Sequence, residues 1–370
     1  MKSEFTAAHD VLRSHLFSVR EKTPRGTFHL DRAASSDIRT GYVDGEPVNR
    51  LVITLRGPGC AWVKRGGGCL MCGHYAGTTR GIVPSADETI AQFRKEIDRY
   101  DMTTVKVVSL YNSGSVLNPD ELPFGALKSL CREIACIPSI SKVVFESRAE
   151  YIDRDKLLVL KDILGQRIML TIAIGLETSD DVRRALCVNK GCTRRDIEQA
   201  LWSIRGIAES QLYVLLGIPF LTESEAITDA VESIRYAHLI GAGEIHIEPL
   251  TLQAHTFLGI LVREGLYRLP SLYSVYEVLK QVVPGIKPYV SPFMHMPLPD
   301  RIPGGCPRCT ERLIHGLLNI YNMARTPESL VYGECGCLDD WYECRAESDE
   351  RPLHQRITDA LRAVSCGVER

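Results

Sequence analysis

The chain has 370 residues, of which 45% are hydrophobic, and a formal net charge of -2. A chain of this length and composition can bury a sizeable core in one large domain or two modest ones. The near-neutral charge argues against a protein that binds nucleic acid without help, because such proteins carry a basic excess. No apolar run approaches the ~18 residues of a membrane span, so we expect no membrane contact.

Residues 1–48 form an expected N-terminal extension. The first residues, MKSEFTAAHD, lack the apolar core of a signal peptide. Because the chain also has 13 cysteines, we expect a cytoplasmic protein whose clustered cysteines bind metals rather than form disulfides. The basic residues Arg13, Arg20, Lys22 and Arg25 are typical of a solvated face.

Short β-branched runs alternate with longer helical patterns from residue 51 onward. The expected strands are 51–55, 104–110, 142–146, 168–175, 211–218 and 244–248. The expected helices are 86–100, 120–135, 153–164, 193–208, 222–240 and 271–283. Capping signals at Thr193 and Thr222 mark two of the helix starts. Strands that each lead into a helix predict an α/β fold with a parallel sheet, as an open sheet or a barrel.

We expect the barrel form, a partial (β/α)6 TIM-like barrel at 49–285. In such folds the chemistry collects at the carboxyl ends of the strands. The alternation stops where prolines cluster between Pro284 and Pro307, so residues 286–370 are expected to be a small cysteine-rich C-terminal extension.

A glycine-rich loop with three cysteines follows the first expected strand. The segment GCAWVKRGGGCLMCGHYAG gives Cys60, Cys69 and Cys72 a C-x8-C-x2-C spacing. Three thiolates can hold three irons of a [4Fe–4S] cluster and leave the fourth iron open to a cofactor. Zinc is the alternative, but structural zinc prefers four ligands, and the nearest candidate, His74, is a strained reach. The loop therefore predicts an iron–sulfur cluster.

The loop and the segments after the later strands resemble the radical S-adenosylmethionine (radical-SAM) superfamily. The segments are SLYNSGSVLNPDELP, FESRAEYI, IGLETSDDVRRALCVNKGCT, LLGIPFLTESEAITDA and IEPLTLQ. Together they resemble the Elp3-like branch, and most closely the radical-SAM subunits of archaeosine synthase. The loop departs from the usual superfamily spacing, in which three residues separate the first two cysteines.

The resemblance implies a tRNA-modifying lyase. In that family a partner subunit attaches lysine to a 7-deazaguanine base of tRNA. The radical enzyme then cleaves a C–N bond of the lysine, so that archaeosine remains and an aldehyde fragment leaves. A [4Fe–4S] cluster, S-adenosylmethionine, an external electron donor, tRNA and the lysine-transferring subunit are the implied cofactors and partners. The cofactor supplies the 5′-deoxyadenosyl radical, so no catalytic side chain is assigned.

The resemblance also implies a set of cofactor-binding residues. Met71 stands where an aromatic residue usually packs near the adenine. Ser113, Gly114 and Ser115 stand at the contact to the methionyl amino group, although the usual acidic residue of that motif is missing. The alternative for this loop is a simple turn capped by Asn112.

Three more side chains belong to the expected cofactor site. Glu177 would bond ribose hydroxyls or an amino group, and its alternative is a solvated loop acid. Arg148 would pair with the methionyl carboxylate or a substrate anion, and its alternative is an ion pair with Glu146 or Glu150. Ile218 would pack on the adenine or in the core.

A second cysteine group lies in the C-terminal extension. Cys306 and Cys309 form one pair, and Cys335 and Cys337 form another. Four thiolates fit a structural zinc site, which we favour over a second iron–sulfur cluster because a fully ligated site needs no open position. Cys344 is a candidate substitute for one ligand.

Two other functions stay open. The first is a radical-SAM enzyme that acts on another small-molecule or peptide substrate, which the near-neutral charge favours if no partner contributes tRNA binding. The second is a zinc-stabilised nucleic-acid-binding protein without catalysis.

Overall fold

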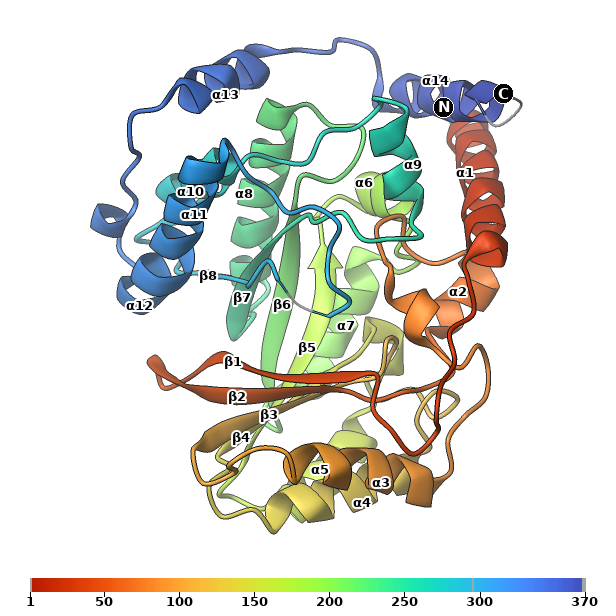
Figure 1. The fold of residues 1–370 in the computed structure, drawn as a ribbon, viewed down its shortest axis with the longest axis vertical. Coiled ribbons are helices and arrows are strands. Elements are labelled where there is room, and N and C mark those ends of the chain that lie inside the picture. Colours follow the sequence, from red (N-terminus) through yellow and green to blue (C-terminus); the bar gives the residue numbers. More distant parts are fainter. Residues whose placement is uncertain (1, 295, 368–370) are drawn as a thin grey trace.

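A computed structural model describes residues 2–294 and 296–367. The fold is one curved eight-stranded sheet in the order β1 to β8, with helices on its outer face (Figure 1). The strands are β1 (Ser35–Val43), β2 (Glu46–Thr54), β3 (Val105–Tyr111), β4 (Lys142–Glu146), β5 (Met169–Glu177), β6 (Glu209–Leu216), β7 (Glu244–Pro249) and β8 (Tyr289–Val290). β1 is antiparallel to β2, and the other pairs are parallel. This partial barrel confirms the predicted α/β fold.

The long helices that follow strands β2 to β7 cover the outside of the barrel. They are α3 (Ala86–Ile97), α4 (Phe124–Ala135), α5 (Arg154–Leu164), α7 (Arg194–Ile204), α8 (Glu223–Leu239) and α10 (Leu272–Val282). Thr193 and Thr222 begin α7 and α8 with the predicted capping boxes, in which each hydroxyl accepts a backbone N–H three residues later.

The two faces of the sheet differ in polarity. On the outer face, fully buried side chains such as Leu51, Val108 and Ile172 pack against the helices and form the main core. On the inner face, Val107, Val144 and Ala173 form only a small apolar cluster. Charged side chains such as Arg50, Glu146 and Glu248 also lie on this face, and a cavity lies inside the barrel.

Shorter elements complete the described chain. They are α2 (Ala61–Gly66), η1 (His74–Gly77), η2 (Ala149–Tyr151), α6 (Asp181–Arg183), η3 (Arg184–Val188), α9 (Phe257–Arg263), α11 (Pro307–His315), η4 (Gly316–Tyr321), α12 (Asn322–Ala324), η5 (Pro327–Ser329) and α13 (Gly336–Ala346). None of the helices in the described ranges is long and apolar enough to cross a bilayer.

Two terminal helices pack on each other at one side of the barrel. α1 (Lys2–Lys22) lies against α14 (Leu353–Gly367), and α1 also contacts α2 beside the cysteine loop (Figure 1). The prediction that Arg20 lies on a solvated face is wrong, because its side chain is buried in this contact and only 4% exposed.

The sheet continues past residue 285. β8 pairs with β7 through His246 and Tyr289. Beyond β8, α11 packs beside α10. The division of the chain at residues 48 and 285 stays a prediction.

Candidate active site

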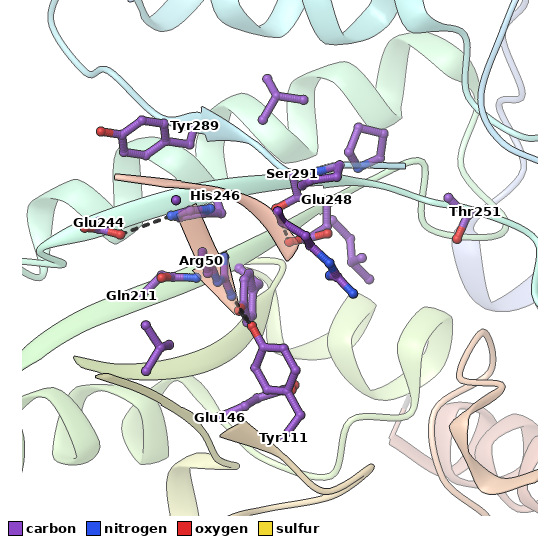
Figure 2. A pocket seen from close by; sticks show the side chains of 18 of the residues that line it. Arg50, Tyr111, Glu146, Gln211, Glu244, His246, Glu248, Thr251, Tyr289 and Ser291 are labelled. Carbon is purple, nitrogen blue, oxygen red and sulfur yellow. Dashed lines mark hydrogen bonds and ion pairs between the residues drawn. The ribbon is translucent and has the colours of Figure 1, made fainter. Parts of the chain in front are cut away.

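A cavity of about 530 Å³ lies inside the partial barrel (Figure 2). It follows the strands along their length, since its lining includes both Lys142 at the start of β4 and Glu146 at its end. Cys69, Met71 and Cys72 also line it. The cysteine loop and the polar inner face of the sheet therefore belong to one site.

Two glycines shape the backbone of the cysteine loop. Cys60 is the N-cap residue of α2, and Cys69 and Cys72 follow two glycines with left-handed backbone. Gly67 and Gly68 both have a φ of 79°, which side-chain-bearing residues rarely adopt. A Cβ atom on Gly67 would lie 2.7 Å from the Leu16 Cβ of α1. The glycines thus let the loop turn tightly against the N-terminal helix.

Burial keeps the loop thiols protonated in the absence of a metal. It raises the pKa of Cys60 and of Cys69 to about 11 and the pKa of Cys72 above its usual value. Because iron binds the thiolate, metal binding at this loop must displace protons.

The loop thiols are spaced more widely than the four C-terminal thiols. Among the described residues, the Sγ atoms of the four C-terminal cysteines all lie within 4.8 Å of one another. Those of Cys60, Cys69 and Cys72 do not. One tetrahedral zinc would hold sulfurs about 3.8 Å apart. A cubane separates its cysteine sulfurs further, because each binds a different iron. Cys60, Cys69 and Cys72 are therefore not gathered around a single ion, and their binding of a [4Fe–4S] cluster stays a prediction.

Arg20 fixes the loop through its carbonyl oxygens. Its guanidinium donates hydrogen bonds to the carbonyls of Gly67 at 3.0 Å, Cys69 at 2.8 Å and Cys72 at 2.9 Å. Sequence reasoning missed this role, because nothing local distinguishes Arg20 from the exposed Lys22.

Asn189 holds the same loop from the other side. This fully buried residue follows η3, and its amide donates to the Gly66 and Gly68 carbonyls, both at 2.7 Å. The indole of Trp62 in turn donates to the Asn189 carbonyl at 2.6 Å. The segment after β5 therefore positions the loop after β2.

Glu121 joins the cysteine loop to the predicted Ser113–Ser115 segment. One carboxylate oxygen accepts the Ala61 N–H at 2.8 Å, and the other accepts the Ser115 N–H at 2.6 Å. A Cβ atom on Gly114 would lie 3.0 Å from the Cys60 Cα. The segment is thus next to Cys60, as a cofactor-binding loop requires, and Glu121 is an organising residue that the sequence did not indicate.

The Ser113–Ser115 segment also makes internal contacts. The Ser115 side chain is fully buried and accepts the Arg148 N–H at 3.2 Å. Asn112 donates to the Ser115 carbonyl at 3.3 Å, which is the capped turn considered as the alternative. Ser113 has a φ of 59° and stays partly exposed. The contact of the segment with a methionyl amino group stays a prediction.

Arg148 lies between the cysteine loop and the segment after β5. It is only 5% exposed, pairs with Glu150 at 2.7 Å and donates to the Lys190 carbonyl at 2.6 Å. Its guanidinium also lies 5.4 Å from the Trp62 ring centre. The structural ion pair with Glu150 is therefore present, and the contact with a methionyl or substrate anion stays a prediction.

Glu177 reaches the cavity from a bulge at the end of β5. The register shifts between Gly175 and Glu177, and Glu177 has a φ of 65°. Its carboxylate pairs with Lys190 at 2.6 Å, and both residues line the cavity. A Cβ atom on Gly175 would lie 2.1 Å from a Glu177 carboxylate oxygen and 2.3 Å from the Lys190 Nζ, so a larger residue there would displace the ends of this ion pair. Glu177 is thus a cavity residue and not a solvated loop acid.

The two expected apolar contacts lie in one cluster. Ile218 is 1% exposed and packs with Leu70, whereas Met71 is partly exposed and lines the cavity. Only Met71 presents free surface to a ligand, and its contact with adenine stays a prediction.

The inner face carries charged residues that the sequence analysis did not single out. Burial raises the pKa of Glu146 to about 7 and that of Glu248 to about 8. Burial also raises the pKa of Glu244, but hydrogen bonds from His246 and Lys142 outweigh it and lower the pKa to about 2. Polar residues at alternate positions of KVVFE and EIHIE carry this signal, because period-two polarity places side chains on one face.

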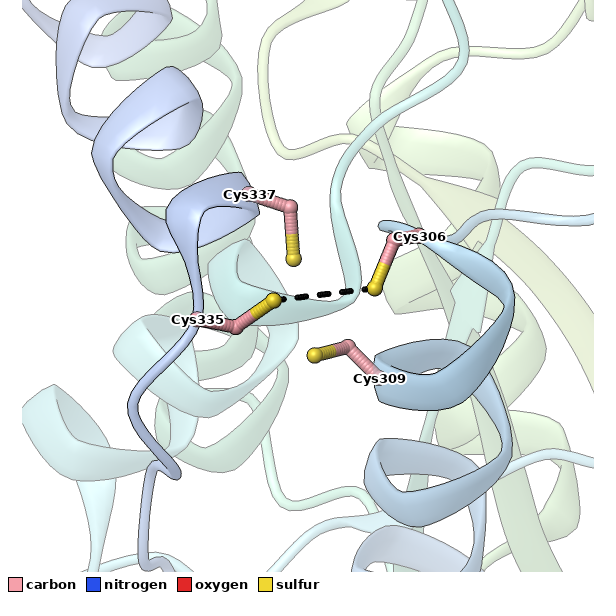
Figure 3. Close-up of side chains that lie close together, drawn as sticks. All are labelled: Cys306, Cys309, Cys335 and Cys337. Carbon is pink, nitrogen blue, oxygen red and sulfur yellow. Dashed lines mark hydrogen bonds between the residues drawn. The ribbon is translucent and has the colours of Figure 1, made fainter.

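The four C-terminal cysteines converge at a second location (Figure 3). Sγ atoms of Cys306, Cys309, Cys335 and Cys337 all lie within 4.8 Å of one another. Burial alone raises the pKa of Cys337, but hydrogen bonds from the backbone of Cys306 and from Tyr273 outweigh it and lower the pKa to about 7. The four thiols are close enough together to hold one metal ion, and Cys344 is not part of this group.

The fold and the cysteine loop define the class of this protein as a radical-SAM enzyme. A relative from Methanosarcina acetivorans, named archaeosine synthase subunit beta, is 28% identical over 89% of this chain and 94% of its own. The protein of that name from Thermococcus kodakarensis is 30% identical over 64% of this chain and 73% of its own. The chain belongs to the archaeosine synthase subunit beta family.

Solved structures match this chain only at low similarity. A crystal structure of methylornithine synthase matches with a TM-score of 0.45 and 14% identity over 76% of this chain and 70% of that chain. No protein-family model matches the chain.

Proposed function

We propose that this protein is a carbon–nitrogen lyase that forms archaeosine in tRNA. Its substrate is a 7-deazaguanine base that already carries lysine, and the bond broken is a C–N bond of that lysine. The membership in the archaeosine synthase subunit beta family supports the proposal. The observation that carries it is the three-thiol loop at a cavity large enough for such a base.

Three loop thiols are proposed to hold the cluster and leave one iron open. Cys60, Cys69 and Cys72 are the ligands, and the backbone bonds from Arg20 and Asn189 keep the loop closed around them. A bound cluster and S-adenosylmethionine would together supply the 5′-deoxyadenosyl radical. The protein's part is to position the substrate and to admit the one water that supplies the aldehyde oxygen.

The remaining cofactor contacts are proposed around that loop. Met71 and Glu177 border the cavity next to the cysteines and suit an adenine and a ribose. Arg148, Ser115 and Ile218 are buried, so their contribution is to shape the pocket and its charge. Ser113 and Gly114 lie beside Cys60 and suit the methionyl end.

We propose a single structural zinc ion at the four C-terminal thiols. The close spacing of the Sγ atoms supports one ion, because tetrahedral zinc places its sulfurs about 3.8 Å apart. A second cluster would spread the four sulfurs further. The site lies beside α10, and so its metal would tie α11 and α13 to the barrel.

We propose that tRNA recognition needs the lysine-transferring subunit. An external electron donor would reduce the cluster. The net charge of -2 offers little attraction for a polyanion. The same observation favours a second candidate, a radical-SAM enzyme that acts on a small molecule or peptide.

One experiment separates the two candidates. The anaerobically reconstituted protein is incubated with reductant, S-adenosylmethionine and lysine-bearing tRNA, and the nucleosides are analysed by mass. We expect archaeosine and 5′-deoxyadenosine in equal amounts. If 5′-deoxyadenosine forms while the lysine-bearing base stays intact, with and without the partner subunit, the second candidate replaces the first.

A further inference from the structure

The barrel cavity holds ionisable side chains that have no ion-pair partner. In the described part of the chain, Arg50 has no ion-pair partner, and its guanidinium bonds the hydroxyl groups of Ser109, Tyr111 and Tyr213. Glu146 has no ion-pair partner either, and Glu248 accepts a hydrogen bond from the Ser291 hydroxyl. A buried charge without a partner is costly, so a site that keeps both signs unpaired is suited to a ligand that carries both.

An unpartnered amide lies in the same cavity. Gln211 is 2% exposed, lines the cavity, and its Nε2 has no hydrogen-bond partner. Along the sheet ladder, Glu146 pairs with Ala173, and Ala173 pairs with Gln211. The small alanine between them leaves room on the inner face, and Figure 2 shows Gln211, Glu146, Arg50 and Glu248 around the cavity.

Two other carboxylates of the cavity, Glu244 on β7 and Glu177 at the end of β5, do not fill this role because each is already paired. Glu244 is already paired with Lys142 at 2.6 Å and with His246 at 3.2 Å. Glu177 is paired with Lys190. The unpaired set is therefore confined to one cation, two carboxyl groups and one amide.

The proposed reaction leaves a group of matching chemistry. An aldehyde product requires that the broken C–N bond belong to a CH2 carbon, so the lysine is joined to the base through its side-chain nitrogen. Its α-ammonium and α-carboxylate then remain free, as a zwitterion at the far end of a flexible chain.

We propose that the cavity binds this zwitterionic α-amino-acid end, an assignment that rests on the proposed function. Arg50 and Gln211 take the carboxylate. Glu146 and Glu248 bind the ammonium group. Its positive charge would keep both side chains in the ionised carboxylate form. By anchoring the far end of the lysine, these residues would place its reacting carbon toward the cysteine loop, and they determine which adduct is accepted.

The test measures binding of three probes to the reconstituted protein by calorimetry. The probes are the 7-deazaguanine base joined to lysine, to 1,5-diaminopentane, which lacks the carboxylate, and to 6-aminohexanoate, which lacks the α-ammonium. A charge-assisted hydrogen bond is worth a factor of roughly 10 to 100 in affinity. We expect the wild-type protein to prefer the lysine probe over each of the others by such a factor.

Each variant should remove one of the two preferences. Arg50→Gln should abolish the preference for the lysine probe over the diaminopentane probe and keep the preference over the 6-aminohexanoate probe. Glu248→Gln should abolish the preference over the 6-aminohexanoate probe and keep the preference over the diaminopentane probe. Because Arg50 also supports Ser109 and Tyr111, Gln211→Leu is a second carboxylate-side variant that loses no internal bond. Glu133→Gln, on the exposed pair with Arg94, is the matched control and should keep both preferences.

Three outcomes overturn the assignment. If the variants keep both preferences while the wild type converts lysine-bearing tRNA, the subsite is wrong and the proposed function stands. If the variants lose affinity for S-adenosylmethionine together with affinity for the lysine probe, the residues bind the cofactor instead. If the wild type neither prefers the lysine probe nor converts the tRNA, the proposed function fails as well.

Discussion

At the scale of single residues, the site depends on buried polar groups that hold backbone. Arg20 and Asn189 bond the carbonyls around the cysteines, and Glu121 bonds the amides. The cysteines themselves were predictable, because their spacing is local in sequence. Their supports were not, since Arg20 lies 52 residues from Cys72 and only tertiary packing brings the two together.

Replacement of a loop cysteine should remove the cluster without unfolding the barrel. We expect Cys69→Ala protein to lose most of its iron and all 5′-deoxyadenosine formation, because two thiolates cannot anchor the cubane. Circular dichroism should stay unchanged. Cys136→Ala, at an exposed thiol away from the cavity, is the control and should keep its iron. Full activity of Cys69→Ala would contradict the ligand assignment.

Loss of Arg20 should destabilise the cluster-free protein. Arg20→Met leaves three loop carbonyls without their donor, and we expect the free energy of unfolding to fall by about 3 kcal/mol. Lys22→Met on the same helix removes an exposed charge and should change it by less than ~0.5 kcal/mol. Urea unfolding of both variants measures the difference. Equal values would show that the loop does not depend on Arg20.

Glu248 should make the stability of the apo protein fall as pH rises. Its folded pKa of about 8 exceeds its usual 4.5, so the folded state holds a proton that the unfolded state releases between these values. Glu248→Gln should therefore gain stability relative to the wild type as pH rises from about 5 to about 9, by ~1.4 kcal/mol or more. A difference in urea midpoint that does not vary with pH would contradict the burial of an unpaired acid.

At the scale of elements, alternation in the sequence was a good guide. The six strands and six helices of the core were predicted within a few residues, because β-branched runs and capping residues are local signals. α1, β1 and α14 were missed, since α1 and α14 are defined by packing on each other and β1 by its pairing with β2. The alternation of EIHIE predicts a strand with one polar face. The sequence does not show that this face lines a cavity.

The C-terminal helices should depend on their metal. Cys309→Ser or chelation should lower the melting temperature by several degrees, because metal binding is part of the folding free energy. Cys344→Ser lies outside the four-thiol group and should leave it unchanged. Metal analysis should find about one zinc per chain, and iron in its place would support a second cluster.

At the scale of the whole molecule, a net charge of -2 offers a tRNA little attraction, so the proposed tRNA reaction should depend on a partner. The barrel supplies the cavity, and Arg20 of α1 holds the cysteine loop through its carbonyl oxygens. We expect tRNA affinity to rise at least tenfold when the lysine-transferring subunit is added, measured by filter binding at physiological salt. Equal affinity with and without that subunit would contradict the shared-site proposal.

The most direct test of the account is whether the loop cluster has an open iron. The electron paramagnetic resonance spectrum of the reduced, anaerobically reconstituted protein is recorded with and without S-adenosylmethionine. We predict a [4Fe–4S]⁺ signal that is absent in Cys69→Ala and shifts when S-adenosylmethionine is added. A protein that retains no iron at this loop, or a signal that S-adenosylmethionine leaves unchanged, would contradict the central claim.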